Sequence, residues 1–269
     1  MKKCYIVGAG EFYGSIHPCE DDMVIAADGG VMHLLSLGII PDVIVGDFDS
    51  LEESLENGDS SAKDLYRVKN SAEKRGDDAS SEAVGGKTDF AEGLLGEVTL
   101  RVKNCKDDGR EVSSFTMGGK SVEIHRHPVM KDETDMYLAY EIGARKGYCS
   151  FELYGGVGGR EDHTFANYCL LLKAKNDKND MILVGNDTKI FVVKNEKIKI
   201  FGSAGATVSI FAFGERAEGV SIRGLKYEAE NITLDLSIPL GVSNSFLESG
   251  EGEITVENGA ALVVIYGND

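Results

Sequence analysis

Two aspartates suited to metal binding follow an apolar run in the segment Pro41-Asp42-Val43-Ile44-Val45-Gly46-Asp47-Phe48-Asp49-Ser50. If the run is a buried strand, Asp47 and Asp49 stand two residues apart and project to the same side of its carboxyl end. Two like charges this close cost free energy unless a cation bridges them, and Mg²⁺ prefers carboxylate oxygens together with substrate phosphates. The segment predicts a magnesium site, or equally a turn in which one aspartate caps a following helix.

Two further stretches place carboxylates in comparable positions. Asp28 follows the apolar run Met23–Ala27 and precedes two glycines. Asp132 and Asp135 stand at i and i+3 of a predicted helix start and share one face, although Asp132 or Thr134 could instead cap that helix. Three acidic sites that converge on one edge of a parallel sheet favour a metal cluster over three separate caps.

A glycine-rich segment is a candidate anion-binding site. Gly155-Gly156-Val157-Gly158-Gly159-Arg160-Glu161-Asp162-His163 follows an apolar run and opens a predicted helix, which Asp162 can cap. Its glycines allow main-chain amides to approach an oxyanion, and Arg160 can bind phosphate oxygens bidentately. The segment lacks the Gly-Lys-Ser/Thr of a Walker A loop. His163 fits an acid–base role and a structural role equally well.

The elements that must position these residues fall into two groups. In residues 1–186, apolar runs alternate with helical patterns, which predicts an α/β domain around a mostly parallel sheet. The predicted strands are Cys4–Val7, Met23–Ala27, Val43–Val45, Ser121–His125, Phe151–Tyr154 and Met181–Val184, and the predicted helices are a short one around Val31–Leu35, Thr134 to about Lys146, and Asp162 to about Lys175. Residues 187–269 change to period-2 stretches and predict an all-β sandwich, with strands at Lys189–Val193, Lys197–Phe201, Thr207–Phe213 and Ala261–Tyr266.

Residues 51–120 form an atypical insert in the first predicted domain. Ser60–Gly86 is rich in Ser, Ala, Asp, Lys and Gly and has no helical or strand periodicity, so we expect Asn57 to about Gly96 to be mostly loop. Glu97–Lys103 and Glu111–Met117, on either side of Asp107-Asp108-Gly109, predict a β-hairpin.

The chain is strongly acidic, since 28 basic and 45 acidic side chains give a net charge of −17. Such a surface repels phosphate backbones and anionic lipid, so neither nucleic acid nor a membrane is an expected partner. No apolar run approaches the roughly 20 residues of a membrane helix, and we expect a cytoplasmic protein. The five scattered cysteines argue against a disulfide framework or a zinc site, and most are expected to be buried thiols.

In combination, these segments resemble the thiamine pyrophosphokinase (thiamine diphosphokinase) family. The resemblance covers Cys4–Ser50 and Val129–Tyr266. It is carried by Ala27–Gly30, Pro41–Ser50, Lys131–Asp135 and Gly159–Asn167, and in the β region by Gly224–Tyr227 and Gly241–Asn244. The resemblance implies an N-terminal α/β catalytic domain, a C-terminal β-sandwich, and a homodimer that binds thiamine between the catalytic domain of one subunit and the sandwich of its partner.

The resemblance also implies roles for single residues. The metal ligands would be Asp47, Asp49 and Asp135, and the catalytic set would be Asp28, Asp47, Asp49, Asp135, Arg160 and Asp162. The nucleotide would contact Asp132, Thr134, Gly159, Arg160, His163 and Asn167. Thiamine would contact Ser221, Tyr227, Ser243 and Asn244. The Tyr227 ring could stack on the cationic thiazolium.

The implied reaction is attack of the thiamine hydroxyl on the β-phosphorus of ATP, which gives thiamine diphosphate and AMP with the help of Mg²⁺. Because no Ser or Cys has the sequence context of a nucleophile, the residues favour direct transfer between bound substrates. An aspartate is the candidate acceptor of the hydroxyl proton. Two alternatives stay open: a pyrophosphokinase for another hydroxymethyl heterocycle, such as a pterin, and a non-catalytic nucleotide-binding sensor.

Overall fold

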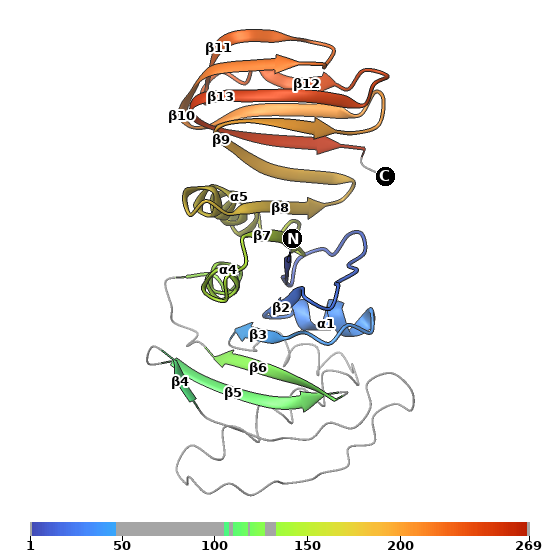
Figure 1. Ribbon diagram of the computed structural model, residues 1–269, viewed down its shortest axis with the longest axis vertical. Coiled ribbons are helices and arrows are strands. Elements are labelled where there is room, and N and C mark those ends of the chain that lie inside the picture. Colours follow the sequence, from blue (N-terminus) through green and yellow to red (C-terminus); the bar gives the residue numbers. More distant parts are fainter. Residues whose placement is uncertain (1, 47–104, 108–109, 118, 127–132, 268–269) are drawn as a thin grey trace, which may run out of the picture. The chain divides into compact units, whose positions relative to one another are not determined.

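The computed structural model describes residues 2–46, 105–107, 110–117, 119–126 and 133–267. The chain forms two compact units (Figure 1). The first unit comprises Met1–Gly10 and His17–Tyr148, and the second comprises Glu11–Ile16 and Cys149–Asp269.

A mostly parallel sheet forms the centre of the first unit. Its strand order is β1 (Cys4–Val7), β2 (Met23–Ala27), β3 (Val43–Gly46), β6 (Lys120–Arg126), β5 (Arg110–Met117) and β4 (Cys105–Asp107) (Figure 1). The first four strands run parallel, as predicted, and β5 and β4 extend the sheet antiparallel. Every residue of β1 and β3 is buried, as expected for parallel strands covered on both faces.

The antiparallel part contains a hairpin at the place that the sequence predicts. A hairpin does surround residues 107–110, but the strand that enters it is Cys105–Asp107, in which Asp107 pairs with Arg110. Glu97–Lys103 and Asn57–Gly96 lie outside the described residues.

Helix α1 (Gly30–Ser36) begins just after β2 and packs on this sheet. Its buried face includes Val31, Leu34 and Leu35, the spacing of i, i+3 and i+4 that the sequence predicts. A Cβ on Gly30 would lie 1.9 Å from the carbonyl oxygen of Val7 at the end of β1, so only glycine allows this approach.

Helix α4 (Asp135–Arg145) packs against β1, β2 and β3. Thr134 caps it, because its Oγ1 accepts a hydrogen bond from the Tyr137 N–H at 3.2 Å. Just beyond the other end of the helix, the Tyr148 hydroxyl donates to the carbonyl oxygen of Asp21 at 3.1 Å, close to the start of β2. Since α4 ends near the amino edge of the parallel strands, its first residue, Asp135, lies toward their carboxyl edge.

Polar contacts tie β6 to neighbouring elements of the first unit. Glu123 Oε2 lies 3.2 Å from His125 Nε2 and 2.9 Å from Lys146 Nζ, which stands directly after α4. The hydrogen bonds from His125 and Lys146 lower the pKa of Glu123 to about 2. Lys120 Nζ lies 2.9 Å from Asp42 Oδ1, just before β3. These contacts support the register at which β6 lies beside β3.

The second unit begins with a parallel pair of strands. β7 (Ser150–Tyr154) and β8 (Asp180–Gly185) are joined by α5 (Glu161–Asn176), which packs against β8 and β9 (Thr188–Phe201). β8 also pairs antiparallel with β9. This pairing continues the sheet across residues 186 and 187, so β7 and β8 group with the C-terminal strands. The predicted domain boundary at that point stays a prediction.

Three long strands, β9, β10 (Thr207–Arg223) and β13 (Glu251–Tyr266), build the sandwich of the second unit (Figure 1). The pairings of β13 with β9 and β10 each contain a register shift, and a bulge of this kind bends the strands locally. β12 (Gly241–Ser245) pairs with the first half of β10, and β11 (Ala229–Asp235) pairs with its second half.

The sandwich core is almost entirely aliphatic and includes Ile200, Ile210, Val220, Ile254 and Val263. The predicted strands Lys189–Val193 and Lys197–Phe201 turn out to be halves of the single strand β9. The interruption between them is Asn195, whose φ of 49° bends the strand without reversing the chain.

The cysteines differ from the expectation that most of them are buried thiols. Cys4 is buried, but Cys19, Cys149 and Cys169 are exposed free thiols, so the expectation that most cysteines are buried is wrong. Cys19 and Cys149 stand in the connections before β2 and β7, where no core surrounds them. No helix in the described ranges is long and apolar enough to cross a membrane.

Glu123→Gln is expected to reduce the pH dependence of stability. The pKa of Glu123 is about 2 in the folded chain against an ordinary value of 4.5, so the carboxylate stabilises the fold above pH 4.5 and loses this contribution as pH falls toward about 2. The Glu123 side chain is 39% exposed, so solvent screens its contacts. We therefore expect the carboxylate to contribute about 1 kcal/mol to the free energy of unfolding at neutral pH.

Chemical unfolding across this pH window measures the effect. Glu248→Gln changes an exposed glutamate of the second unit and serves as the control, whose pH profile should match wild type. A Glu123→Gln profile identical to wild type would contradict the role of the carboxylate.

Candidate active site

Asp28 stands at the carboxyl end of β2 and is held against β3. Its N–H donates to the carbonyl oxygen of Val45 at 2.7 Å, and its φ of 50° lies in the left-handed region that Asp tolerates better than most residues. A Cβ on Gly46 would lie 3.2 Å from the Asp28 Cα, so a glycine suits this contact. The Oδ1 atom of the Asp28 carboxylate is buried. Asp28 therefore lies next to the residue that precedes Asp47.

Asp135, the first residue of α4, is the second described carboxylate of the predicted metal site. Asp47, Asp49 and Asp132 lie outside the described residues. In the part of the chain that the structure describes, no group of three or more His, Cys, Asp or Glu side chains is arranged to hold a metal ion. The carboxylate oxygens of Asp28 and Asp135 are of the kind that Mg²⁺ prefers.

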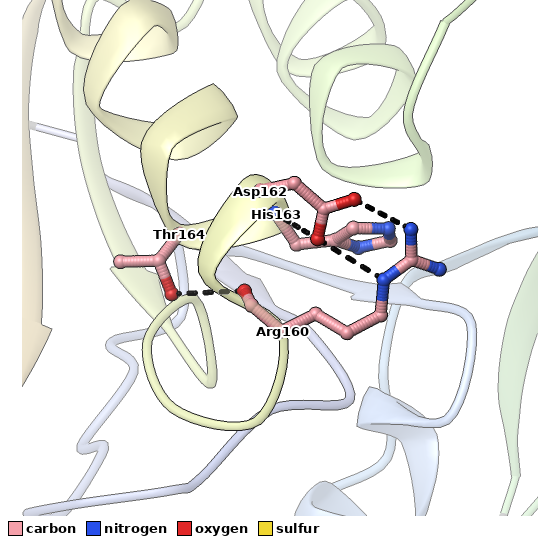
Figure 2. Close-up of polar contacts among 4 residues, drawn as sticks. All are labelled: Arg160, Asp162, His163 and Thr164. Atoms are coloured by element: carbon pink, nitrogen blue, oxygen red, sulfur yellow. Dashed lines mark hydrogen bonds and ion pairs between the residues drawn. The ribbon is translucent and has the colours of Figure 1, made fainter.

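Arg160 and Asp162 form an ion pair at the start of α5 (Figure 2). Arg160 Nε donates to Asp162 Oδ1 at 3.1 Å, and Nη2 donates to Oδ2 at 2.6 Å. This is the two-point contact of a planar guanidinium with a carboxylate. The two side chains are 69% and 64% exposed, and Nη1 of Arg160 points away from the carboxylate. The pair thus holds the guanidinium in one orientation while leaving donors for a ligand.

The ion pair also fixes the charges of both groups. The hydrogen bond from Arg160 lowers the pKa of Asp162 to about 2, and the His163 N–H, which donates to Asp162 Oδ1 at 3.0 Å, acts in the same direction. The same pairing raises the pKa of Arg160. Both side chains are therefore ionised throughout the neutral pH range.

The prediction that Asp162 caps α5 is wrong. The N-cap is Arg160, which makes no side-chain cap bond, and Asp162 lies in the first turn. Its carboxylate turns to the Arg160 guanidinium, a stronger partner than a neutral main-chain amide. The Thr164 hydroxyl donates to the Arg160 carbonyl oxygen at 3.3 Å and adds a second link within this turn (Figure 2).

The glycine loop before α5 is supported from two sides. Gly158 has a φ of 80°, and a Cβ there would lie 2.7 Å from the Glu11 side chain. The Glu11 N–H donates to the carbonyl oxygen of Val157 at 3.0 Å, and the buried Asn167 donates through Nδ2 to the Gly156 carbonyl oxygen at 2.7 Å. Beside Gly159 the space is open, since an added Cβ would meet no atom within 4 Å. An anion could therefore approach the loop at Gly159.

In the β-sandwich, the structure brings Tyr227 and Asn244 together. Asn244 is 6% exposed, and its side-chain amide hydrogen-bonds the main chain of Tyr227 at 2.9 and 2.7 Å. The Tyr227 ring is exposed. Ser221 Oγ accepts a hydrogen bond from the Asn231 N–H at 3.1 Å, and the Ser243 N–H donates to Ser209 Oγ at 3.2 Å.

Two residues that contact the candidate site, Glu11 and Lys226, were not predicted from the sequence. Glu11 packs on the glycine loop from a segment far away in sequence, and it hydrogen-bonds the Tyr13 hydroxyl. Lys226 places its Nζ 5.4 Å from the centre of the Tyr227 ring. No spacing rule links Glu11 to Gly158, whereas the neighbouring basic and aromatic residues Lys226 and Tyr227 could have suggested their contact.

The chain matches two family models. Residues 19–79 and 109–183 match the thiamin pyrophosphokinase catalytic domain, and residues 188–261 match the thiamin pyrophosphokinase vitamin B1 binding domain. A thiamine pyrophosphokinase of Bacillus subtilis (strain 168) is 24% identical over 148 residues, which cover 52% of this chain and 66% of that protein, just under two thirds of its length.

Solved structures of thiamine pyrophosphokinases have a similar fold. The Bacillus subtilis structure has a TM-score of 0.70 at 19% identity, with 100% of both chains covered. The Geobacillus thermodenitrificans structure has a TM-score of 0.68 at 20% identity, with 99% of this chain and 98% of that chain covered. The Candida albicans structure has a TM-score of 0.62 at 14% identity, with coverages of 99% and 89%. With its α/β unit, its β-sandwich and matches to both family domains, this chain belongs to the thiamin pyrophosphokinase family.

Proposed function

We propose that this chain transfers the pyrophosphoryl group of ATP to the hydroxyl of thiamine, giving thiamine diphosphate and AMP. The observation that supports this most is the placement of Asp28 beside Gly46, with Asp135 toward the same edge of the parallel sheet. Open parallel sheets bind ligands at this edge. The match to a vitamin B1 binding domain favours thiamine over a pterin, and the match to the catalytic domain argues against a non-catalytic sensor.

In the proposed reaction, the hydroxyl oxygen of thiamine forms a bond to the β-phosphorus of ATP. The bond between that phosphorus and the oxygen bridging it to the α-phosphorus breaks, and AMP leaves with the bridging oxygen. The hydroxyl proton passes to a base, for which a carboxylate such as Asp28 is our candidate. Such a transfer depends mainly on alignment and on neutralising charge.

Asp47, Asp49 and Asp135 are the proposed ligands of Mg²⁺. When bound, the ion would neutralise charge on the phosphate oxygens and on the departing AMP. Asp28, anchored to β3 through its N–H, would keep a further carboxylate beside these ligands.

The nucleotide phosphates are proposed to bind at the start of α5. Arg160 is oriented by Asp162 and keeps Nη1 directed away from it, so its remaining donors could bind a phosphate (Figure 2). Gly159 borders open space, and His163 stands in the same helical turn. The Asn167 amide supports this loop from behind by donating to the Gly156 carbonyl oxygen. Asp132 and Thr134, at the start of α4, complete the proposed nucleotide set.

Thiamine is proposed to bind at the sandwich through Tyr227, Ser221 and Ser243, which all belong to the second unit. The exposed Tyr227 ring offers a π face to the cationic thiazolium. The Ser221 oxygen already accepts a hydrogen bond from Asn231, so its hydroxyl proton is available for donation to a ring nitrogen.

A homodimer is also proposed. The connection between β11 and β12 exposes three large apolar side chains, Leu236, Ile238 and Leu240, at 53–68% of their surface. Association of two copies would remove this apolar area from water. Analytical ultracentrifugation is expected to give twice the chain mass, and a monomer at micromolar concentration would contradict the proposal.

Asp49→Asn is expected to lower AMP release at least about 100-fold, because the amide removes one negative charge from the proposed metal site. The assay follows thiamine-dependent AMP release from ATP with and without Mg²⁺. Asp187→Asn is the control, since Asp187 is exposed at a φ of 50° that Asn adopts readily. Turnover by Asp49→Asn at the wild-type rate would refute the metal assignment.

Arg160→Lys is expected to raise the KM for ATP about tenfold, because lysine keeps the charge but loses the planar fork. Asp162→Asn should act in the same direction with a smaller effect, about threefold, since it loosens the orientation of Arg160. Arg145→Lys, at an exposed arginine of α4, is the matched control. A change in the KM for thiamine instead of ATP would show that Arg160 serves a different substrate.

A further inference from the structure

Asn244 is one of four polar or charged residues of the described chain that are buried, with 6% of its surface exposed. It lies on β12, where it pairs with Val208 of β10. Burying an amide without hydrogen bonds costs free energy, so its partners show what the position is used for.

The side-chain amide of Asn244 is almost fully occupied by main-chain groups. Its Oδ1 accepts hydrogen bonds from the Tyr227 N–H and from the Ser245 N–H, both at 2.9 Å. Its Nδ2 donates to the Tyr227 carbonyl oxygen at 2.7 Å. Both acceptor positions of Oδ1 are therefore used, and a single N–H of the amide is left. Asn244 binds the main chain of Tyr227 at both its N–H and its C=O, as a neighbouring strand would.

Further bonds hold the chain on the amino side of Tyr227. The Lys226 N–H donates to the Ser245 carbonyl oxygen at 2.9 Å. The Gly224 N–H donates to Glu228 Oε1 at 2.8 Å, at a φ of 72° that favours glycine. The main chain from Gly224 to Tyr227 is thus fixed from several sides.

The Tyr227 side chain contrasts with its main chain. Tyr227 as a whole residue is 61% exposed, and Lys226 Nζ lies 5.4 Å from the ring centre. A main chain that is held at several points and presents an exposed aromatic side chain fits a platform on which a ligand ring can stack, once the Lys226 ammonium moves off the ring.

We propose that Asn244 is a positioning residue, which fixes the main chain of Tyr227 so that the ring is held ready for thiamine, and that Asn244 itself does not contact the substrate. This inference rests on the proposed function and changes the role expected for Asn244 from its resemblance to the family. Holding the ring in place before binding removes the ordering cost that a mobile turn would add.

A double-mutant cycle between Asn244 and Tyr227 tests the proposal. Asn244→Ala and Tyr227→Ala should each raise the KM for thiamine about tenfold, while the KM for ATP changes less than about twofold. If Asn244 acts through Tyr227, adding Asn244→Ala to Tyr227→Ala should change the KM for thiamine by less than about twofold. Effects that multiply would show an independent contact and overturn the proposal, as would a wild-type KM in Asn244→Ala.

Asn258→Ala is the matched control, because Asn258 is an exposed asparagine of the same unit that bonds Glu218. It should leave both KM values unchanged. Should Asn244→Ala fail to fold, as judged from its thermal unfolding, Asn244→Ser keeps a small polar side chain and enters the same cycle.

Amide hydrogen exchange gives a readout that needs no thiamine. In Asn244→Ala, the Tyr227 amide should exchange at least about tenfold faster, while the Lys226 amide, bonded to the Ser245 carbonyl, should stay protected. Unchanged protection of the Tyr227 amide would overturn the proposal. A wild-type chain that does not turn over thiamine would refute the proposed function, and the exchange result would then still decide whether Asn244 fixes Tyr227.

Discussion

The in-register parallel pairing of β2, β3 and β6 is the constraint on which the proposed active site depends. Ala27 pairs with Val45, and Gly46 pairs with Arg126, so the strands end close to one another. The hydrogen bond from the Asp28 N–H to the Val45 carbonyl continues the pairing beyond β2 and places a carboxylate at that edge. Without this register, the acidic residues that follow separate strands would have no reason to meet.

The charge of the chain bears on which ligands it favours. A net charge of −17 disfavours anionic partners, yet the proposed reaction requires a triphosphate. The Arg160–Asp162 pair shows how the fold can meet that requirement. The two charges of the pair cancel, and the N–H groups of the guanidinium that do not bond Asp162 are left to bind a phosphate. At the sandwich, an acidic chain and an exposed tyrosine ring both suit a cation. Divalent metal and thiamine are therefore favoured by the overall charge, and the phosphates depend on local donors.

Much of the fold could be predicted from the sequence, because buried parallel strands are continuous apolar runs. The strands that precede Asp28 and Asp47 lie where their apolar residues indicate. Predictions failed where a side chain had several possible partners. Asp162 is of a residue type that often caps helices. The Arg160 guanidinium two residues earlier, however, binds its carboxylate more strongly than a main-chain amide does. Asn195 resembles a turn residue but only bends β9.

The candidate site was harder to predict than the strands. Residue type suggested Tyr227 and Asn244, but only the packing of β12 against the Gly224–Tyr227 turn shows that the asparagine binds main chain. Glu11 supports the glycine loop across a separation of almost 150 residues, and such a contact has no local signature in the sequence.

Phosphorus NMR of the chain with ATP, thiamine and Mg²⁺ tests the central claim most directly, because it identifies every phosphorylated product in one mixture. The account predicts that thiamine diphosphate and AMP appear in equal amounts and that neither appears when thiamine is left out. Formation of ADP with thiamine monophosphate, or of ADP and inorganic phosphate alone, would contradict it.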